Sequence, residues 1–159
     1  MRSLYVEIPG APVAQPRPRV TSFKDGQGNP RVRVYDPPAA SKWKAETRYL
    51  IQVKFPNYKP MEGPISLRVI FYMPRPKTGW VSTQSRREKH LPHTKKPDLD
   101  NLVKSLKDAL TGAVWKDDSQ VCSLSMTKVY AKHSESPRIK VLVQEEVARQ
   151  CMGELDERI

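Results

Sequence analysis

The sequence predicts one α/β domain of the α+β kind, in which helices pack on one face of a small mixed sheet. Two stretches have a helical period, and several others have the alternation or the β-branched and aromatic composition of strands. Their order is strand, helix, strand, helix and then two strands, which favours one layer of helices over a mostly antiparallel or mixed sheet. A length of 159 residues suits a single domain with one core.

The first half of the chain is expected to contain a strand, a helix and a second strand. Residues 3–8 alternate between apolar and polar side chains, as a half-buried strand does. Pro38 can begin a helix, and Trp43 and Leu50 continue it at helical spacing towards residue 55. Residues 63–74 are rich in β-branched and aromatic side chains and are bounded by glycine and proline, which indicates a buried, central strand.

The second helix has the clearest pattern in the chain. When it is placed from Asp100 and turned by about 100° per residue, apolar and polar side chains separate onto two arcs. The apolar arc contains Leu99, Leu102, Val103, Leu106, Ala109 and Leu110. The polar arc contains Asp100, Asn101, Lys104, Lys107 and Asp108. Gly112 lies where a glycine is expected just past a helix end.

The last third of the chain is expected to contain two strands and a tail. Residues 121–132 and 136–146 both alternate, and a hairpin is the economical arrangement of two such neighbours. The folded domain is therefore expected over residues 1–144. Residues 145–159 are acidic and fit a surface helix, an oligomer contact or a frayed end.

The charge of the chain points to a polyanionic partner. The formal net charge is +11, and a single domain this cationic attracts nucleic acid; basicity that serves only solubility is the alternative. The excess is concentrated in two basic loops, residues 9–35 and 74–96. The second of them carries seven lysine or arginine residues against Glu88 alone.

Other features of the sequence exclude several classes of protein. No apolar run approaches the roughly 18 residues of a membrane span, so no membrane partner is expected. The first ten residues lack the apolar stretch of a secretory signal. Two cysteines, Cys122 and Cys151, are too few for a disulfide framework or a Cys-x-x-Cys zinc site, which favours a cytoplasmic location.

Two pairs of aspartates flank the second helix and form the candidate chemical site. Asp98 and Asp100 precede or open the helix, and in an extended Asp-x-Asp segment their carboxylates would point the same way and repel. Asp117 and Asp118 follow after a short return. The alternative interpretation is structural: Asp100 would cap the helix and pair with Lys104, and the second pair would be a turn or cap.

A shared divalent cation would relieve the repulsion between these acids. Oxygen ligands without histidine or cysteine suit Mg²⁺, with Mn²⁺ able to take its place. Carboxylates that hold such an ion, surrounded by basic loops, are typical of metal-dependent phosphodiester cleavage. In that case Lys95 and Lys96, directly before the acids, are candidates for gripping the DNA backbone.

Residues 95–121, KKPDLDNLVKSLKDALTGAVWKDDSQV, resemble the signature of the RusA-type Holliday-junction resolvases, small dimeric endodeoxyribonucleases of bacteria and their prophages. The resemblance implies that Asp98, Asp100 and Asp118 are the magnesium-binding catalytic acids and that Lys104 is the required lysine. Asp117 matches a neighbouring acid and is a further candidate metal ligand.

A weaker likeness extends over residues 3–144, and it includes Arg17 and Arg19 in "RPR", the "YDP" that begins at Tyr35, and Lys128. Arg17, Arg19 and Lys128 are therefore candidate DNA contacts. The turn before Asp117 is shorter than in the best-known member, and residues 75–96 form a long basic insertion.

The resemblance implies a RusA-like fold, a homodimer and a function. That function is the Mg²⁺-dependent resolution of Holliday junctions, by paired symmetric nicks, in DNA recombination and repair. The two-fold symmetry of a four-way junction agrees with a dimer that has two equal sites. Two alternatives stay open: a less selective nuclease for branched or flap DNA, and a non-catalytic DNA-binding protein.

Overall fold

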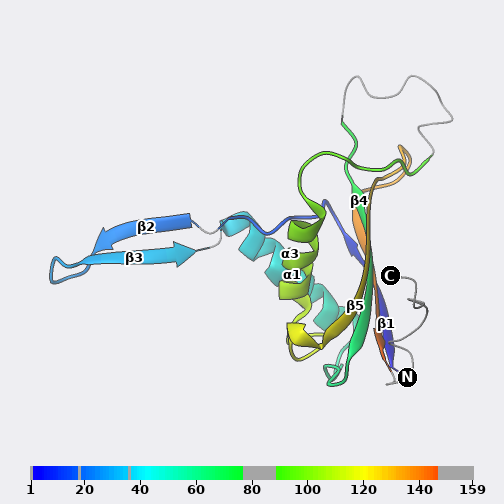
Figure 1. Cartoon of the computed structure of the whole chain (residues 1–159), viewed down its shortest axis with the longest axis horizontal. Coiled ribbons are helices and arrows are strands. Elements are labelled where there is room, and N and C mark those ends of the chain that lie inside the picture. Colours follow the sequence, from blue (N-terminus) through cyan, green and yellow to red (C-terminus); the bar gives the residue numbers. More distant parts are fainter. Residues whose placement is uncertain (1, 18, 36, 77–88, 147–159) are drawn as a thin grey trace, which may run out of the picture.

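The computed structural model describes residues 2–17, 19–35, 37–76 and 89–146 (Figure 1). The helices are α1 (Pro38–Lys54), α3 (Leu99–Leu110) and the short 3₁₀ helix η1 (Asp118–Gln120). The strands are β1 (Ser3–Pro9), β2 (Arg19–Lys24), β3 (Pro30–Tyr35), β4 (Ile65–Met73), β5 (Val121–Tyr130) and β6 (Arg138–Glu145). The expectations for residues 77–88 and for the tail from residue 147 lie outside the described residues.

Four strands form one mixed sheet in the order β1-β6-β4-β5. β6 is antiparallel to both of its neighbours, so Val141 lies opposite Val6 on one side and Val69 on the other. β5 runs parallel to β4, with Met126 opposite Val69. The predicted α+β class and mixed sheet are confirmed.

The predicted hairpin of the last two strands is wrong, because β4 lies between β5 and β6. The burial of the strands explains the order. β4 is apolar and buried along most of its length, and such a strand is stable only with a neighbour on each side. β5 contains Ser123, Ser125 and other exposed residues, which suit the edge of a sheet.

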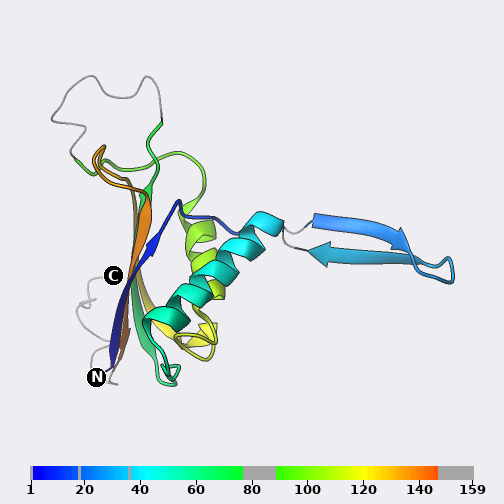
Figure 2. The same ribbon diagram turned by 180° about the vertical axis from the view of Figure 1, so that it is seen from behind.

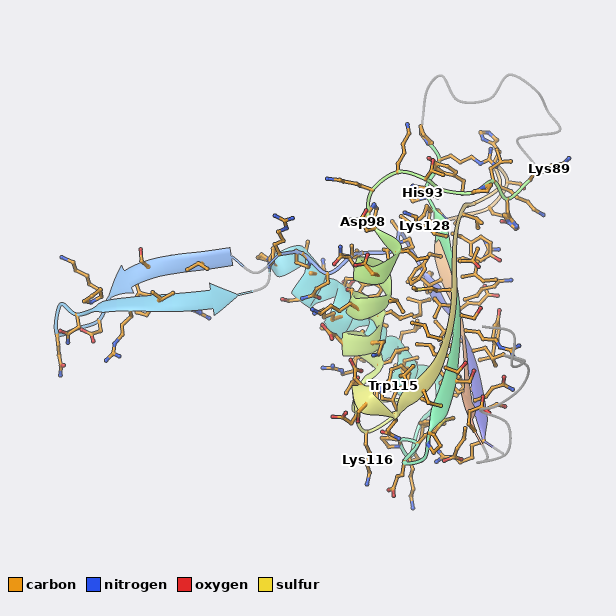
Figure 3. The ribbon with its side chains drawn as sticks, in the orientation of Figure 1. Lys89, His93, Asp98, Trp115, Lys116 and Lys128 are labelled. Carbon is orange, nitrogen blue, oxygen red and sulfur yellow. The ribbon has the colours of Figure 1, made fainter. Side chains whose placement is uncertain are left out.

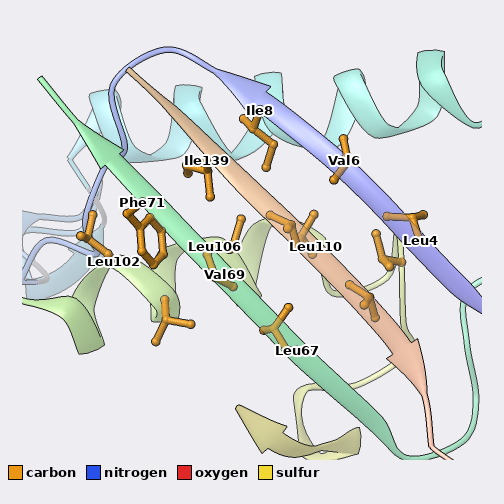
Figure 4. Close-up of a cluster of buried hydrophobic side chains, with 14 of the residues drawn as sticks. Leu4, Val6, Ile8, Leu67, Val69, Phe71, Leu102, Leu106, Leu110 and Ile139 are labelled. Carbon is orange, nitrogen blue, oxygen red and sulfur yellow. The ribbon is translucent and has the colours of Figure 1, made fainter. Parts of the chain in front are cut away.

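α1 and α3 lie side by side on one face of the sheet (Figures 1 and 2). Leu102, Leu106 and Leu110 of α3 are buried against that face (Figure 4). The facing strand residues alternate along the sheet as Leu4, Val6, Ile8, Leu67, Val69, Phe71, Ile139, Val141 and Val143. The predicted apolar arc is therefore the packed face of α3.

The ends of both helices agree with the signals in the sequence. α1 starts at Pro38, and its buried positions include Thr47 and Ile51. α3 ends at Leu110, and Gly112 has a φ of 80°, a left-handed conformation that costs glycine little. Lys44 on α1 forms an ion pair with Asp108 on α3 at 2.8 Å, which ties the two helices together.

A second, two-stranded sheet was not predicted: β2 and β3 pair within the segment interpreted as a basic loop. The hairpin projects from the N-terminal end of α1, away from the four-stranded sheet (Figures 1 and 2). Within the described ranges, no helix is long and apolar enough to cross a lipid bilayer.

Leu106→Ala is expected to lower the free energy of unfolding by about 2–5 kcal/mol, because Leu106 is fully buried and the truncation leaves a cavity. Leu124→Ala is the matched control: Leu124 is 42% exposed, so its loss should cost clearly less. Urea denaturation of both variants measures the difference. Equal losses would contradict the assignment of the packed face of α3.

Candidate active site

Asp98 and Asp100 lie at the N-terminal end of α3, on its solvent side. Asp98 is the N-cap residue, with φ −72° and ψ 148°, and Asp100 is in the first turn of the helix. The Asp98 side chain makes no capping hydrogen bond. Both carboxylates are exposed, and neither has a hydrogen-bond or ion-pair partner among the residues that the structure describes. The helix dipole favours negative charge at this end, which offsets part of their repulsion.

Lys104 lies on the same helix, one turn after Asp100. Its side chain is exposed, and the described part of the chain offers it no acidic partner, so the expected Asp100–Lys104 ion pair of the structural interpretation does not form. The ammonium is therefore available to a ligand that approaches the acids.

The segment that leads into Asp98 is held by Lys128 on β5. The Lys128 ammonium donates hydrogen bonds to the carbonyl oxygens of Lys95 at 2.8 Å and Pro97 at 2.6 Å. Figure 3 labels Lys128 at the same end of the domain as Asp98 and His93. The backbone N–H of His93 donates to the Lys128 carbonyl at 3.1 Å, which adds a short pairing at the edge of β5. Lys128, a predicted DNA contact, thus fixes the position of this segment, while the Lys95 and Lys96 side chains stay exposed.

His93 is a residue of this end that the sequence gave no clear reason to select. Its Nδ1 is buried and has no hydrogen-bond partner within the described ranges, and its ring lies 4.4 Å from the ring of Tyr130. Burial lowers the pKa of the His93 imidazole, and the positive charge of Lys128 lowers this pKa further. The imidazole is therefore held in its neutral form over a wider range of pH.

Hydrogen bonds hold both described ends of the basic loop that follows β4, near Arg75 and near Lys89, against the sheet. The Arg75 guanidinium donates to the carbonyl oxygens of Lys89 and Ala131. The His90 ring lies 2.7 Å from a carboxylate oxygen of Glu135, and hydrogen bonding by His90 and then Arg138 lowers the pKa of Glu135 to about 2. These contacts fix where the loop leaves and rejoins the domain.

Asp118 is held at the other end of α3 by a compact hydrogen-bond network. Its Oδ1 accepts a hydrogen bond from the Thr111 hydroxyl, and the Trp115 indole N–H lies 3.3 Å from the same oxygen. Lys107 adds an ion pair at 3.6 Å. Trp115 is fully buried, so it packs in the core while its indole N–H reaches Asp118.

Asp117 has a structural role in the described chain. Its carboxylate accepts hydrogen bonds from the Ser119 N–H at 2.8 Å and the Ser119 hydroxyl at 2.6 Å, and these bonds lower its pKa. Gln120 completes a capping box by accepting from the Asp117 N–H at 2.7 Å. This is the cap that the structural interpretation of the second aspartate pair predicts.

The expected cluster of three carboxylates does not form within one chain. Asp98 and Asp118 lie at opposite ends of α3, whose 12 residues span about 18 Å at a rise of about 1.5 Å per residue. A Mg²⁺ ion binds its ligands at about 2 Å, so one ion cannot reach both ends. Across the described residues, no group of three or more acidic, histidine or cysteine side chains could hold a metal. A single chain therefore does not fit the implied ion.

The geometry of the aspartate pair also differs from the expected one. Asp100 is inside the first helical turn, so Asp98 and Asp100 are not two positions of one extended segment. Arg17 and Arg19, predicted DNA contacts, precede and begin β2. The chain just before them is tied to this end of α3, because the Gln15 N–H donates to the Asn101 carbonyl at 2.8 Å.

Comparison with known proteins places this arrangement in a family. The family model described as "Endodeoxyribonuclease RusA" matches residues 9–144, which include both ends of α3 and the basic segments. A relative from Bacillus subtilis (strain 168), "Uncharacterized protein YqaN", is 38% identical over 150 residues. That match covers 91% of this chain and 98% of the relative.

Lys128→Met is expected to loosen the segment before Asp98, because methionine keeps the apolar stem but cannot donate to the two carbonyls. A hydrogen bond from a charged group contributes about 1.5–3 kcal/mol, so the His93 amide should exchange with solvent at least about tenfold faster. The pKa of the His93 imidazole should rise in an NMR titration, since one of the charges that lowers it is gone. Lys116→Met, at the far end of α3, is the control and should change neither. If the His93 amide of Lys128→Met exchanges at the wild-type rate, Lys128 does not hold this segment in place.

Proposed function

The chain belongs to the endodeoxyribonuclease RusA family, and on that premise we propose that it is a divalent-metal-dependent endonuclease that resolves four-way DNA junctions by paired, symmetric nicks. The observation that carries the proposal is the group formed by Asp98, Asp100 and Lys104. Asp98 and Asp100 are exposed at the N-terminal end of α3, Lys104 is exposed one turn further along the same helix, and all three side chains lack partners among the described residues. The two free carboxylates could bind a cation, and the free ammonium of Lys104 could contact a phosphodiester.

The charge of the chain supports DNA as the substrate. Lys95 and Lys96 are exposed just before the acids, and we propose that they contact phosphates beside the cut, with Arg17 and Arg19 on the same DNA. Asp98 and Asp100 would repel the same phosphates, so a cation between them is needed. We propose Mg²⁺, with Mn²⁺ able to replace it, because the candidate ligands are carboxylate oxygens.

The position of Asp118 supports a homodimer. If two copies pack so that their α3 helices run antiparallel, Asp118 of one copy comes to the helix end that holds Asp98 and Asp100 of the other. We propose that each site combines acids from both copies, so that a dimer has two equal sites. Two such sites match the two-fold symmetry of a four-way junction. The reaction would serve recombination or repair of DNA in a bacterial cytoplasm, including that of prophages.

The first test compares cleavage of a junction, a fork and a linear duplex, each with and without Mg²⁺. The junction should be nicked only when the metal is present. Asp100→Asn and Lys104→Ala should each lower the rate by at least about 100-fold, because each removes charge that acts on the reacting phosphate. Glu46→Gln and Lys42→Ala, an exposed pair on α1, are matched controls and should cut at the wild-type rate.

Each other outcome of this test has a defined meaning. Equal cutting of fork and junction would support a less selective branched-DNA nuclease. Metal-independent binding that falls steeply with salt, without scission, would support the non-catalytic alternative. If Asp100→Asn and Lys104→Ala both nick the junction at the wild-type rate, the catalytic roles assigned to the acids and the lysine are wrong.

The second test asks whether the sites are shared between copies. Asp100→Asn and Asp118→Asn proteins are each expected to be inactive. A mixed dimer would combine the intact Asp98 and Asp100 of one copy with the intact Asp118 of the other, which restores one of its two sites. After the two variants are mixed and allowed to exchange subunits, single-strand nicking should return without paired cleavage. If the mixture stays inactive although mass spectrometry detects mixed dimers, the shared-site proposal fails.

A further inference from the structure

The β2–β3 hairpin is a two-stranded ribbon that stands apart from the body of the domain. The views in Figures 1 and 2 show it extending from the start of α1, and its described residues are absent from the hydrophobic core. An isolated two-stranded hairpin is marginally stable in water, so its retention in the fold suggests that it has a partner.

The register divides the hairpin into two faces. Thr21 lies opposite Arg33 and Phe23 opposite Arg31, so one face carries two guanidinium groups and an aromatic ring. The other face contains Val20 and Val32, each 67% exposed, together with Ser22 and the exposed Lys24 near the turn. Basic side chains therefore project from both sides of the ribbon.

The single acid of the hairpin is used to build its turn. The Asp25 carboxylate accepts hydrogen bonds from the N–H groups of Gln27 at 3.0 Å and Asn29 at 2.9 Å, and from Arg31 Nε at 3.1 Å. These bonds lower the pKa of Asp25 and fix the shape of the tip. Asp25 presents little negative charge to a ligand, while Lys24 and Arg33 have no acidic partner among the described residues.

The chain that leads to the root of the hairpin is held at the end of α3 that carries the unpaired acids. The hydrogen bond from the Gln15 N–H to the Asn101 carbonyl, at 2.8 Å, anchors the chain shortly before β2 beside Asp100. From this root, strands of six residues reach about 20 Å at about 3.4 Å per residue. That length equals about six base pairs, since each base pair of B-DNA occupies about 3.4 Å of helix axis.

We propose that the β2–β3 hairpin is a ribbon that grips one duplex arm of the DNA, away from the reacting phosphate, through Lys24 and Arg33. A two-stranded ribbon fits the major groove of B-DNA, which is about 12 Å wide. This inference rests on the proposed function for the location of the cut. In this role the hairpin would increase the affinity of the protein for DNA and would fix the position of the bound duplex arm.

The charge favours DNA over a second copy of the chain as the partner of the hairpin. A second copy would have to supply free acidic groups to match the ribbon. Several acids of the body are paired within it: Glu7 with Arg138 and Lys140, Glu62 with Lys116, Asp108 with Lys44, and Glu135 with Arg138. The unpaired Asp98 and Asp100 lie together at one helix end and do not form a row of charges. The DNA backbone supplies a regular row of negative charges along the full length of the ribbon.

The test measures binding without cleavage. The Lys24→Gln/Arg33→Gln double variant and the wild type are titrated against a labelled duplex and a labelled junction in metal-free buffer over a salt series. Two lost phosphate contacts should make the slope of log K against log salt shallower by about 1.8 and weaken binding at low salt by at least about tenfold. A hydroxyl-radical footprint should lose protection on one arm of the junction and keep it at the crossover.

A matched control removes the same charge elsewhere. Lys59→Gln/Arg68→Gln changes two exposed residues, one in the loop after α1 and one on β4, and should keep the wild-type slope. Circular dichroism should be unchanged for both double variants, because none of the four residues is in the core. If the hairpin variant binds both DNAs with wild-type affinity and slope, the ribbon proposal is overturned.

The competing partner is tested through the valine face. Val20→Thr/Val32→Thr keeps β-branched residues but makes that face polar. Light scattering measures the molecular mass of this variant, and a titration measures its affinity for DNA. If the mass is half that of the wild type and the affinity falls only in proportion to the lost dimer, the hairpin joins two copies and the ribbon proposal fails. Because binding is measured without metal, a wild type that cuts no DNA would overturn the proposed function and leave the ribbon proposal supported by the altered slope.

Discussion

The packing of α3 on the sheet is the contact on which the rest of the structure depends. Leu102, Leu106 and Leu110 are buried on one side of the helix, which forces its polar side to face outward. Rotation of α3 by half a turn would expose three leucines and cost several kcal/mol, so the direction of Asp100 and Lys104 is fixed by the core. The same packing fixes both helix ends, where the candidate acids lie, and the outward direction of Lys104 between them.

Unpaired acids in so cationic a chain are tolerated because they are exposed and lie at a helix start. Water solvates the carboxylates of Asp98 and Asp100, and the dipole of α3 favours negative charge there. The Asp118 carboxylate, in contrast, is half-buried. It has hydrogen bonds with Thr111 and Trp115 and an ion pair with Lys107. One end of α3 thus presents free charge, and the other holds its acid in a defined position.

The sequence was sufficient wherever structure is local. The bounds of α3, its apolar arc and the start of α1 at Pro38 follow from spacing and capping, which act over a few residues. The order of strands could not be obtained in this way, since the insertion of β4 between β5 and β6 depends on burial of the whole sheet. The β2–β3 hairpin was missed because a proline-rich stretch precedes it, its strands alternate arginine with valine only briefly, and its Asp25 turn was not recognised. The separation of Asp98 from Asp118 likewise depends on the tertiary path after α3.

The parallel pairing of β4 and β5 has a consequence for where this domain meets its ligand. β4, α3 and β5 form a β-α-β crossover, and the connection from β4 to α3 leaves the sheet at the carboxyl end of β4. In open α/β sheets, ligands bind beyond the carboxyl ends of parallel strands, where helix N-termini converge. Asp98 and Asp100 open the helix at this edge, and the connecting residues 74–96 are among the most basic of the chain. A change in the length of this connection would therefore alter the edge beside Asp98 and Asp100 while leaving β4, α3 and β5 in register.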